Sequence, residues 1–242
     1  MDMATISVIT PTWNSAETIE HCLQSVANQS YPSKEHLIID NDSTDETMAI
    51  VRSYADTYSH IRILSEKDSG IYDAMNKSLP LCRGDWVYFL GSDDTLYDTS
   101  VFKDIAIELE EGIDIIYGDV ILDGLGKRYG GLFSSNRLRW MNICQQAVFY
   151  RKSLFDIVGA FDTKYRISAD WDFHIRCFNR MDVHIQHVDR IIAKYALTGY
   201  STGKTDYRFM LDRAIKNVPL NRLGTTKGLS CATKKKIENG NL

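Results

Sequence analysis

The sequence predicts an α/β fold in which a mostly parallel central sheet is covered by helices on both faces. Short apolar or β-branched runs alternate with helical patterns through residues 6–98, and each run ends in a cluster of polar residues. The run 86–90 is followed by two adjacent acids, Asp93 and Asp94. Because ligands of open α/β sheets bind at the carboxyl ends of the strands, these acids are candidates for a binding site.

The elements of this repeat follow from their hydrophobic periodicity. Strands are expected at residues 6–10, 37–40, 61–64 and 86–90, and helices at 19–26, 48–58 and 71–79. Asn14 and Ser15 offer an N-cap to the first helix, and residues 43–46 offer one to the second. Strands that alternate with helices in this way indicate a Rossmann-like amino-terminal half.

Polar clusters follow all four strands, at residues 10–14, 40–43, 67–70 and 92–94. In a parallel sheet these clusters share one edge and therefore one crevice. Neither a glycine-rich dinucleotide fingerprint nor a phosphate-binding Gly-Lys-Ser/Thr loop occurs in the chain. Adjacent carboxylates repel each other unless a cation or hydroxyl donors lie between them. Asp93 and Asp94 therefore imply a hard metal ion that carries phosphates, although an isolated acid pair is more often a solvated turn.

Composition indicates one globular unit or two closely fused halves, since 44% of the 242 residues are hydrophobic and 25% are charged. The five cysteines are odd in number and lack metal-ligand spacing, as expected for reduced thiols in a cytoplasmic protein. No run reaches the roughly 18 apolar residues of a membrane span, and the amino terminus lacks the pattern of a signal peptide.

Blocks of sequence that carry a family resemblance occur at residues 7–14 with Glu17, and at 39–45, 68–77, 89–94 and 166–173. Together they resemble the family-2 glycosyltransferases of the GT-A fold, of the bacterial O-antigen, capsule and exopolysaccharide type. The resemblance implies a GT-A sheet with a smaller acceptor-side half, and a UDP-sugar donor. We therefore expect a nucleotide-sugar-binding half over residues 1–98, an acceptor-binding and catalytic half over 99–203, and a basic tail over 204–242.

The resemblance also implies roles for individual residues at the donor. Asp40 would accept a hydrogen bond from uracil, Asp93 would bind ribose, and Asp94 would hold Mn²⁺ or Mg²⁺. The family's Asp-x-Asp-Asp pattern begins here with Gly91, so its first acid is missing. The further nucleotide-sugar contacts implied are Thr10, Pro11, Thr12, Glu17, Gly70, Asn76, Lys77 and Ser92. By its place alone, Lys77 is more often a solvated helix-end charge.

The chemistry also requires a base, because direct displacement at an anomeric carbon needs a carboxylate that takes the acceptor hydroxyl's proton. Asp170 is the candidate by resemblance, and it precedes an apolar helical pattern whose terminal N–H groups would stabilise an anion. An Asp at such a position is also a common helix cap. Asp172 is the alternative base, with Asp119 as a weaker candidate for the donor or acceptor site.

The Gln-x-x-Arg-Trp motif and the membrane helices of the processive relatives are both missing from the sequence. We therefore expect a non-processive, inverting enzyme that forms a β-linkage from a UDP-sugar of the glucose or galactose type. The resemblance implies an undecaprenyl-pyrophosphate-linked saccharide as acceptor, in the synthesis of a surface polysaccharide.

The tail from Lys204 onward carries nine Lys/Arg and three Asp/Glu, which leaves a net charge of −10 on residues 1–203. Its apolar residues Phe209, Met210, Ala214 and Val218 approximate one helical face. We expect either a peripheral contact with anionic lipid on the inner face of the membrane or a solvated tail. We expect no nucleic-acid partner.

Two other classes of function remain open from the sequence. A sugar-nucleotide nucleotidyltransferase also joins a Rossmann-like sheet to acids and a metal, but it requires a glycine-rich Lys/Arg loop near the start, and residues 10–14 do not form one. A catalytically silent nucleotide-sugar binding module would be favoured only if Asp94 or Asp170 were misplaced.

Overall fold

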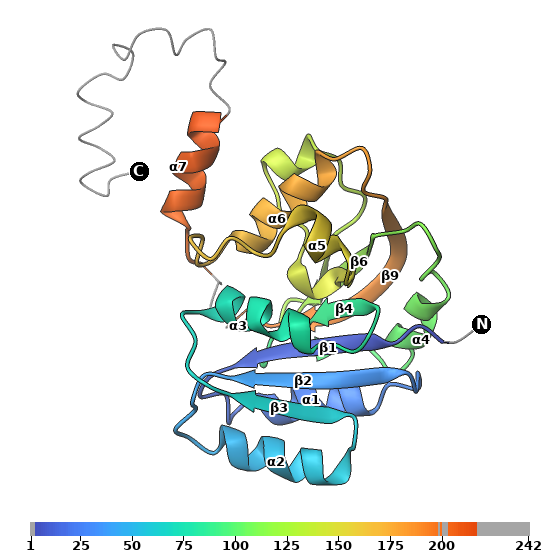
Figure 1. The fold of residues 1–242 in the computed structure, drawn as a ribbon, viewed down its shortest axis with the longest axis vertical. Helices are drawn as coiled ribbons and strands as arrows, with labels where there is room; N and C mark the ends of the chain where they lie inside the picture. The colour runs from blue at the N-terminus through green and yellow to red at the C-terminus, as the bar shows by residue number, and fades with distance from the viewer. Residues whose placement is uncertain (1–2, 198, 200–202, 217–242) are drawn as a thin grey trace, which may run out of the picture. The chain divides into compact units, whose positions relative to one another are not determined.

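A computed structural model of the chain describes residues 3–197, 199 and 203–216 (Figure 1). The strands are β1 Ile6–Thr12, β2 Lys34–Asp40, β3 Ile61–Ser65, β4 Trp86–Phe89, β5 Thr95–Leu96, β6 Ile115–Leu122, β7 Lys127–Tyr129, β8 Val148–Arg151 and β9 Ile185–Tyr195. The α-helices are α1 Ile19–Ala27, α2 Thr47–Thr57, α3 Ile71–Ser78, α4 Val101–Ala106, α5 Leu154–Val158, α6 Ala169–Phe178 and α7 Tyr207–Lys216. Short 3₁₀ helices lie at η1 Leu79–Leu81, η2 Arg137–Arg139 and η3 Gln145–Ala147. Of the described residues, those up to 205 form one compact unit, and those from 206 onward belong to another.

The strands form a single sheet in the order β3-β2-β1-β4-β8-β6-β9-β5, with β7 paired to β6. Strands β3, β2, β1 and β4 are parallel, and the arrowheads of the first three point to the same edge (Figure 1). Strand β9 is parallel to β6, whereas β8, β7 and β5 run antiparallel to their neighbours. The predicted α/β fold class is confirmed, with the parallel order concentrated in the amino-terminal half.

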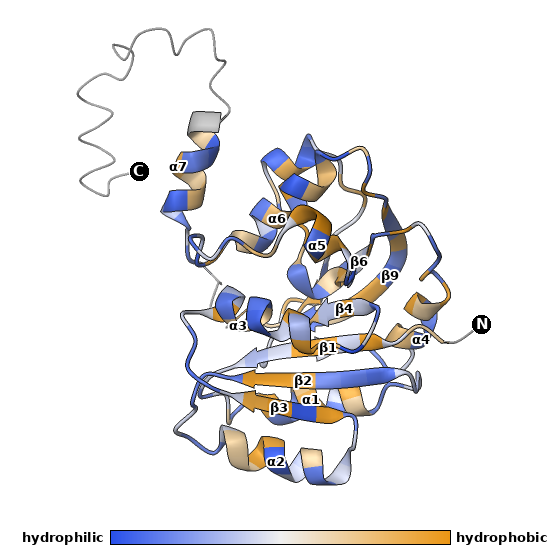
Figure 2. Cartoon of the chain, in the orientation of Figure 1, coloured by the Kyte–Doolittle hydropathy of each residue, from blue (hydrophilic) through white to orange (hydrophobic). Residues whose placement is uncertain are grey.

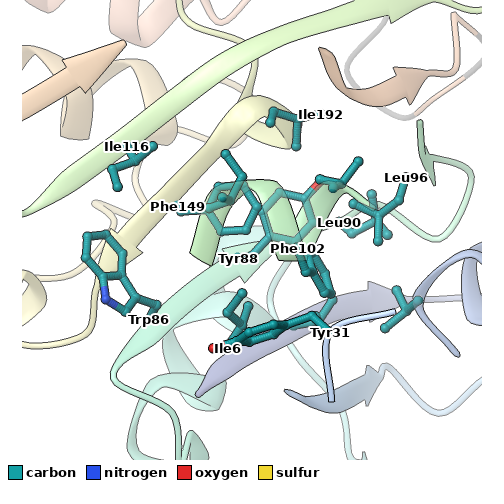
Figure 3. Close-up of a cluster of buried hydrophobic side chains, with 14 of the residues drawn as sticks. Ile6, Tyr31, Trp86, Tyr88, Leu90, Leu96, Phe102, Ile116, Phe149 and Ile192 are labelled. Carbon is teal, nitrogen blue, oxygen red and sulfur yellow. The ribbon is translucent and has the colours of Figure 1, made fainter. Parts of the chain in front are cut away.

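One face of the sheet is covered by α1 and α4. Along β4, Trp86 and Tyr88 point to this face, because side chains alternate between the two faces of a strand. Tyr88 stacks on Phe149 of β8 with ring centroids 4.5 Å apart, and Phe102 of α4 meets Tyr88 edge-on (Figure 3). The cluster is buried, and it joins the parallel strands to β8 at the centre of the sheet.

The opposite face carries a second aromatic cluster, built on Phe89, the next residue of β4. Phe89 packs edge-on against Phe155 of α5 and against Phe161. Phe155 stacks on Phe173 of α6 with ring centroids 4.9 Å apart. Helices therefore cover both faces of the sheet as predicted, and α6 is fixed over the carboxyl end of β4.

Helix α2 shows how the amphipathic pattern produces this layering. Apolar and polar residues alternate along it in Figure 2, and its buried residues Met48 and Val51 pack with Ile38 of β2 and Ile61 of β3. Burying such an apolar stripe is the main source of stability for a short surface helix. The exposed face of α2 remains polar.

The loop after β1 does not provide the cap that the sequence predicts for helix α1. Helix α1 begins at Ile19 as expected, but Thr18 occupies its N-cap position, not Asn14 or Ser15. Asn14, with a φ of 47°, accepts a hydrogen bond from the backbone N–H of Thr44 at 2.9 Å, and Ser15 Oγ lies 2.9 Å from Ser92 Oγ. These contacts tie the ends of β1, β2 and β4 together and form one wall of a crevice.

Within the described residues, none of the helices is long and apolar enough to cross a membrane. The sheet is continuous across residue 98, because β5 pairs with β9. The division into a donor half and an acceptor half remains a prediction. Of the tail, α7 is described and residues 217–242, including Val218, lie outside the described residues.

Candidate active site

A cavity of about 1100 Å³ opens at the carboxyl ends of the parallel strands. Its walls come from the loops after β1, β2 and β4, from the start of α3, and from residues 142–146 and 166–171. The sequence-predicted residues that line it are Pro11, Thr12, Glu17, Gly70, Ser92, Asp93, Asp94 and Asp170. Residues far apart in sequence thus meet in one cavity.

Thr10 and Asp40 do not line the cavity and instead fix the strands behind it. Thr10 Oγ1 lies 2.9 Å from Nε2 of His36 on β2, and both residues are fully buried. Asp40 Oδ2 accepts hydrogen bonds from Ser65 Oγ at 2.6 Å and from the Ser43 backbone N–H at 3.1 Å. Asp40 therefore shapes the loop that follows β2.

Asn76 and Lys77 also lie outside the cavity wall. The Asn76 side-chain amide clamps the backbone of Phe161, with its Nδ2 donating to the carbonyl at 2.9 Å and its Oδ1 accepting from the N–H at 3.0 Å. Lys77 Nζ donates to the Lys67 carbonyl at 2.7 Å and lies 3.2 Å from Glu66 Oε1. The ammonium of Lys77 belongs to a surface charge network at the end of α3.

Asp94 is the most deeply buried acid of the cavity, with an exposed fraction of 1%. Its Oδ2 accepts a hydrogen bond from Gln146 Nε2 at 2.6 Å, and its Oδ1 accepts one from the Ala196 N–H at 2.7 Å. Burial and, second, the negative charge of Asp93 raise the pKa of Asp94 to about 7. Burial also raises the pKa of Asp93. Carboxylates whose proton affinity is raised by burial and by each other are stabilised by a bound cation.

Gly91 explains how the two acids come so close to one strand end. A Cβ atom at this position would meet Asp94 Oδ2 at 2.5 Å and Asp93 Oδ1 at 2.9 Å. The carboxylates therefore occupy the space that a side chain at residue 91 would need. The glycine stands where the family pattern has its first acid, and the two remaining acids fold over it.

The acids fit a divalent cation that arrives together with a diphosphate. Mg²⁺ and Mn²⁺ prefer oxygen ligands, and Mg²⁺ is commonly held by one or two carboxylates plus substrate phosphates and water. Asp93 and Asp94 supply such oxygens. Across the described part of the chain, no three His, Cys, Asp or Glu side chains gather into a ready-made metal shell. Asp93 and Asp94 are therefore the residues that would hold such an ion.

Asp170 lies in the first turn of α6, with 8% of its surface exposed. Its Oδ1 lies 2.7 Å from the Tyr72 hydroxyl, and its Oδ2 accepts a hydrogen bond from Asn142 Nδ2 at 2.7 Å. Burial raises the pKa of Asp170 to about 6, although Tyr72, the Trp171 N–H and Asn142 lower it. The helix terminus stabilises the anion as expected, but desolvation has the larger effect.

The alternative bases have partners of their own. Asp172 Oδ2 accepts a hydrogen bond from Arg176 Nε at 2.8 Å within α6. Asp119 pairs with Arg128 across the β6–β7 hairpin and with His187 at 3.2 Å. Neither acid lines the cavity.

Three side chains to which the sequence assigned no role form hydrogen bonds with the two acids. Gln146 holds Asp94, whereas Tyr72 and Asn142 hold Asp170. Their partners lie 52, 98 and 28 residues away, so no local spacing connects them. Tyr72 does fall within the block 68–77 that carries the family resemblance, and this was the one available signal.

Comparison with known proteins identifies the family. Residues 7–163 match the family described as "Glycosyl transferase family 2". The "PGL/p-HBAD biosynthesis glycosyltransferase" of Mycobacterium bovis (strain BCG / Pasteur 1173P2) is 38% identical over 224 residues, which cover 90% of this chain and 86% of that protein.

Solved structures share the fold. Staphylococcus aureus TarS 1-349 in complex with UDP-GlcNAc superposes with a TM-score of 0.70 and 22% identity, covering 96% of this chain and 70% of that chain. The mannosyltransferase PcManGT from Pyrobaculum calidifontis, in complex with GDP-Man and Mn²⁺, gives a TM-score of 0.65 and 20% identity, covering 88% of this chain and 62% of that chain. Since the family match spans more than half of the residues, the chain belongs to glycosyltransferase family 2.

Proposed function

We propose that this chain is a non-processive, inverting glycosyltransferase that moves one sugar from a UDP-sugar to an acceptor hydroxyl by direct displacement. One observation carries the proposal: Asp94 and Asp170 line the same cavity, one beside a second acid and the other between two neutral hydrogen-bond donors. The first arrangement suits a cation with a diphosphate. The second suits a base that takes up a proton.

The donor would lie along the wall formed by the loops after β1 and β4. Pro11, Thr12 and Glu17 line this wall and would face the base and ribose, while Asp93 would accept a hydrogen bond from ribose. Asp94, with Asp93, would hold Mn²⁺ or Mg²⁺. When bound, such an ion neutralises the pyrophosphate and stabilises the charge that develops on the leaving group.

Asp170 would act on the acceptor. Its carboxylate takes the proton of the attacking hydroxyl as the new bond from the acceptor oxygen to the anomeric carbon forms. The bond from that carbon to the phosphate oxygen breaks, and UDP leaves with the electron pair. A single displacement inverts the anomeric carbon, so an α-linked donor gives a β-linked product.

The structural neighbour that binds UDP-GlcNAc supports a UDP-sugar donor, and we propose glucose or galactose as its sugar. As acceptor we propose a lipid-linked saccharide, such as an undecaprenyl-pyrophosphate-linked one, in the synthesis of a surface polysaccharide. The mycobacterial relative supplies a second candidate, because its name places it in PGL/p-HBAD biosynthesis. Both proposals share the attack of a hydroxyl on the donor sugar.

The decisive experiment measures release of the nucleoside diphosphate, UDP from a panel of UDP-sugars and GDP from GDP-mannose, with Mn²⁺ and with chelator, in the presence of each acceptor class. We expect one UDP-sugar to be used and the reaction to need both metal and acceptor. Tight UDP binding without turnover of any donor would instead identify a silent binding module. Use of a sugar phosphate with a nucleoside triphosphate would identify a nucleotidyltransferase.

We also propose that the basic tail brings the enzyme to an anionic membrane surface at the inner face of the cell membrane. Within α7, Met210 and Leu211 are half exposed, and the further basic residues lie outside the described part. Cosedimentation with vesicles should require anionic lipid, weaken at high salt and fall on truncation after Gly203. Equal binding by a folded, truncated chain would overturn this proposal.

A further inference from the structure

Behind Asp170 lies a chain of side chains that the reaction itself does not use. His174 Nδ1 lies 2.8 Å from Asn142 Oδ1, and His174 Nε2 lies 2.6 Å from the Tyr150 hydroxyl. The Tyr150 hydroxyl lies 3.0 Å from the side-chain amide of Gln145. His174 and Tyr150 are fully buried, and Gln145 is 9% exposed. Burying this much polar surface is costly unless its hydrogen bonds are satisfied.

The direction in which these hydrogen bonds are donated follows from Asn142. Its Nδ2 donates to Asp170, so its Oδ1 faces His174, and an amide oxygen can only accept a hydrogen bond. His174 must therefore carry its proton on Nδ1. Burial lowers the pKa of His174 to about 3, so the ring is neutral and its Nε2 is an acceptor.

Tyr150 completes the sequence of donors. Its single hydroxyl proton is directed to His174 Nε2, so the oxygen of the hydroxyl must accept from Gln145. Gln145 Nε2 is a buried nitrogen with no hydrogen-bond partner when Oε1 faces Tyr150. Turning this amide by 180° keeps its shape and lets Nε2 donate to the Tyr150 hydroxyl oxygen.

We propose that His174 is a positioning residue for the base, because it locks the Asn142 amide with its N–H toward Asp170. Every donor in the chain then points the same way, from Gln145 through Tyr150, His174 and Asn142 to the carboxylate. Aligned hydrogen bonds polarise one another and strengthen the last one. This inference rests on the proposed role of Asp170 as the base.

Other titratable groups face Asp170 from the elements around it. They are Tyr72 of α3, Tyr129 of β7, Tyr150 of β8 and Cys144 beside η3. Burial raises the pKa of each of these groups, so all remain neutral near pH 7. Asp170 is therefore the group of this cluster that changes charge between pH 5 and 8.

The test compares His174→Asn with His174→Leu. Asparagine and leucine have nearly the same shape, and both remove the imidazole that stacks on the Tyr150 ring. Only the Asn variant offers a donor near the position of Nδ1, so the pair isolates the hydrogen bond from packing. In the Leu variant the Asn142 amide can turn its oxygen toward Asp170, which disfavours the carboxylate.

The readouts are the pH profile of kcat/KM and the titration of Asp170 by carboxyl ¹³C NMR, with Asp170→Asn used to assign the signal. For His174→Leu we expect the acid limb and the NMR titration to move up by about one pH unit. We expect His174→Asn to stay near the wild-type values. Equal shifts in the two variants, or none in either, would overturn the proposal.

Two further measurements keep the test decisive. Asn142 is only partly buried, so Asn142→Leu should fold even if His174→Leu does not, and it should raise the Asp170 titration by at least as much. An unchanged titration of Asp170 in that variant would contradict the proposed chain of hydrogen bonds. The NMR readout does not need turnover, so an active Asp170→Asn enzyme would reject the proposed base and leave the positioning role to be judged separately.

Discussion

The two acids proposed to act in the reaction, Asp94 and Asp170, are both buried, and burial is the main cause of the raised pKa of each, but their neighbours differ. Asp94 lies beside a second carboxylate, whose charge adds to the effect of burial. Asp170 has no acidic neighbour among the main causes of its shift, and Tyr72 and Asn142 partly offset its burial. The difference teaches that burial alone does not define a role. In the proposed function Asp94 would hold a cation, whereas Asp170 would exchange a proton near neutral pH.

The largest effect is expected from a variant that removes the proposed cation ligand Asp94. Asp94→Asn removes the charge and keeps the shape, so metal-dependent UDP binding should be lost and turnover should be abolished. Calorimetry with UDP, in Mn²⁺ and in chelator, measures this. Asp119→Asn is the matched control, because Asp119 is a buried acid outside the cavity, and its folded variant should bind UDP normally. Unchanged UDP affinity in Asp94→Asn would show that Asp94 does not bind the metal.

The variant Asp170→Asn tests the proposed role of Asp170 as the base. Transfer should fall by about 10²-fold or more, the usual contribution of a general base, while UDP affinity stays near the wild-type value. Steady-state turnover and calorimetry on the same preparation give both numbers. Asp172→Asn, two residues along α6, should keep most of the activity. Near-normal turnover in Asp170→Asn would falsify its role as the base.

The raised pKa of Asp94 also predicts how the stability of the protein depends on pH. An Asp in an unfolded chain has a pKa of about 3.9, whereas that of folded Asp94 is about 7. Between about pH 3.9 and about pH 7 Asp94 is protonated in the folded protein and ionised in the unfolded chain. The contribution of Asp94 to the free energy of unfolding therefore falls as the pH rises through this range. Asp94→Asn should therefore stabilise the metal-free protein at pH 8, on the order of 1 kcal/mol, with the gain fading toward pH 4. Thermal unfolding at both pH values checks this, and a gain independent of pH would contradict it.

The last prediction, with a milder effect on function than either acid variant, concerns the space above Gly91. In Gly91→Ala the new methyl group must displace the Asp94 carboxylate from its hydrogen bonds with Gln146 and Ala196. We expect metal-dependent affinity for UDP to fall by roughly 10-fold, a loss of about 1.4 kcal/mol. Turnover at saturating donor should change much less, because the Asp170 site is untouched. A drop in turnover with unchanged affinity would mean that the two acids are not independent.

Local patterns predicted most of the scaffold. Hydrophobic periodicity located the first four strands and the helices between them, and the polar residues at the strand ends marked the cavity. The caps were harder to predict, because Asn14 and Ser15 bind the loops after β2 and β4 instead of capping α1. A polar residue before a helix has several possible partners, and the packing of the loops selects one of them.

Among the predicted site residues, the structure separates those that line the cavity from those that build its walls. Asp40 and Asn76 belong to the family's blocks, yet their side chains hold Ser43 and Phe161, respectively. A sequence block shows that a residue type is needed at a position. It does not show whether that residue faces a ligand or the backbone.

The sequence by itself determined the α/β order, the polar strand ends and the two acids, because these depend on neighbours within a few turns or one strand. Only the tertiary structure decided what surrounds each acid. Tyr72, Asn142 and Gln146 reach the acids across 28 to 98 residues of chain. The pKa of a buried acid depends on desolvation and on nearby dipoles and charges, and both arise only when distant segments pack together.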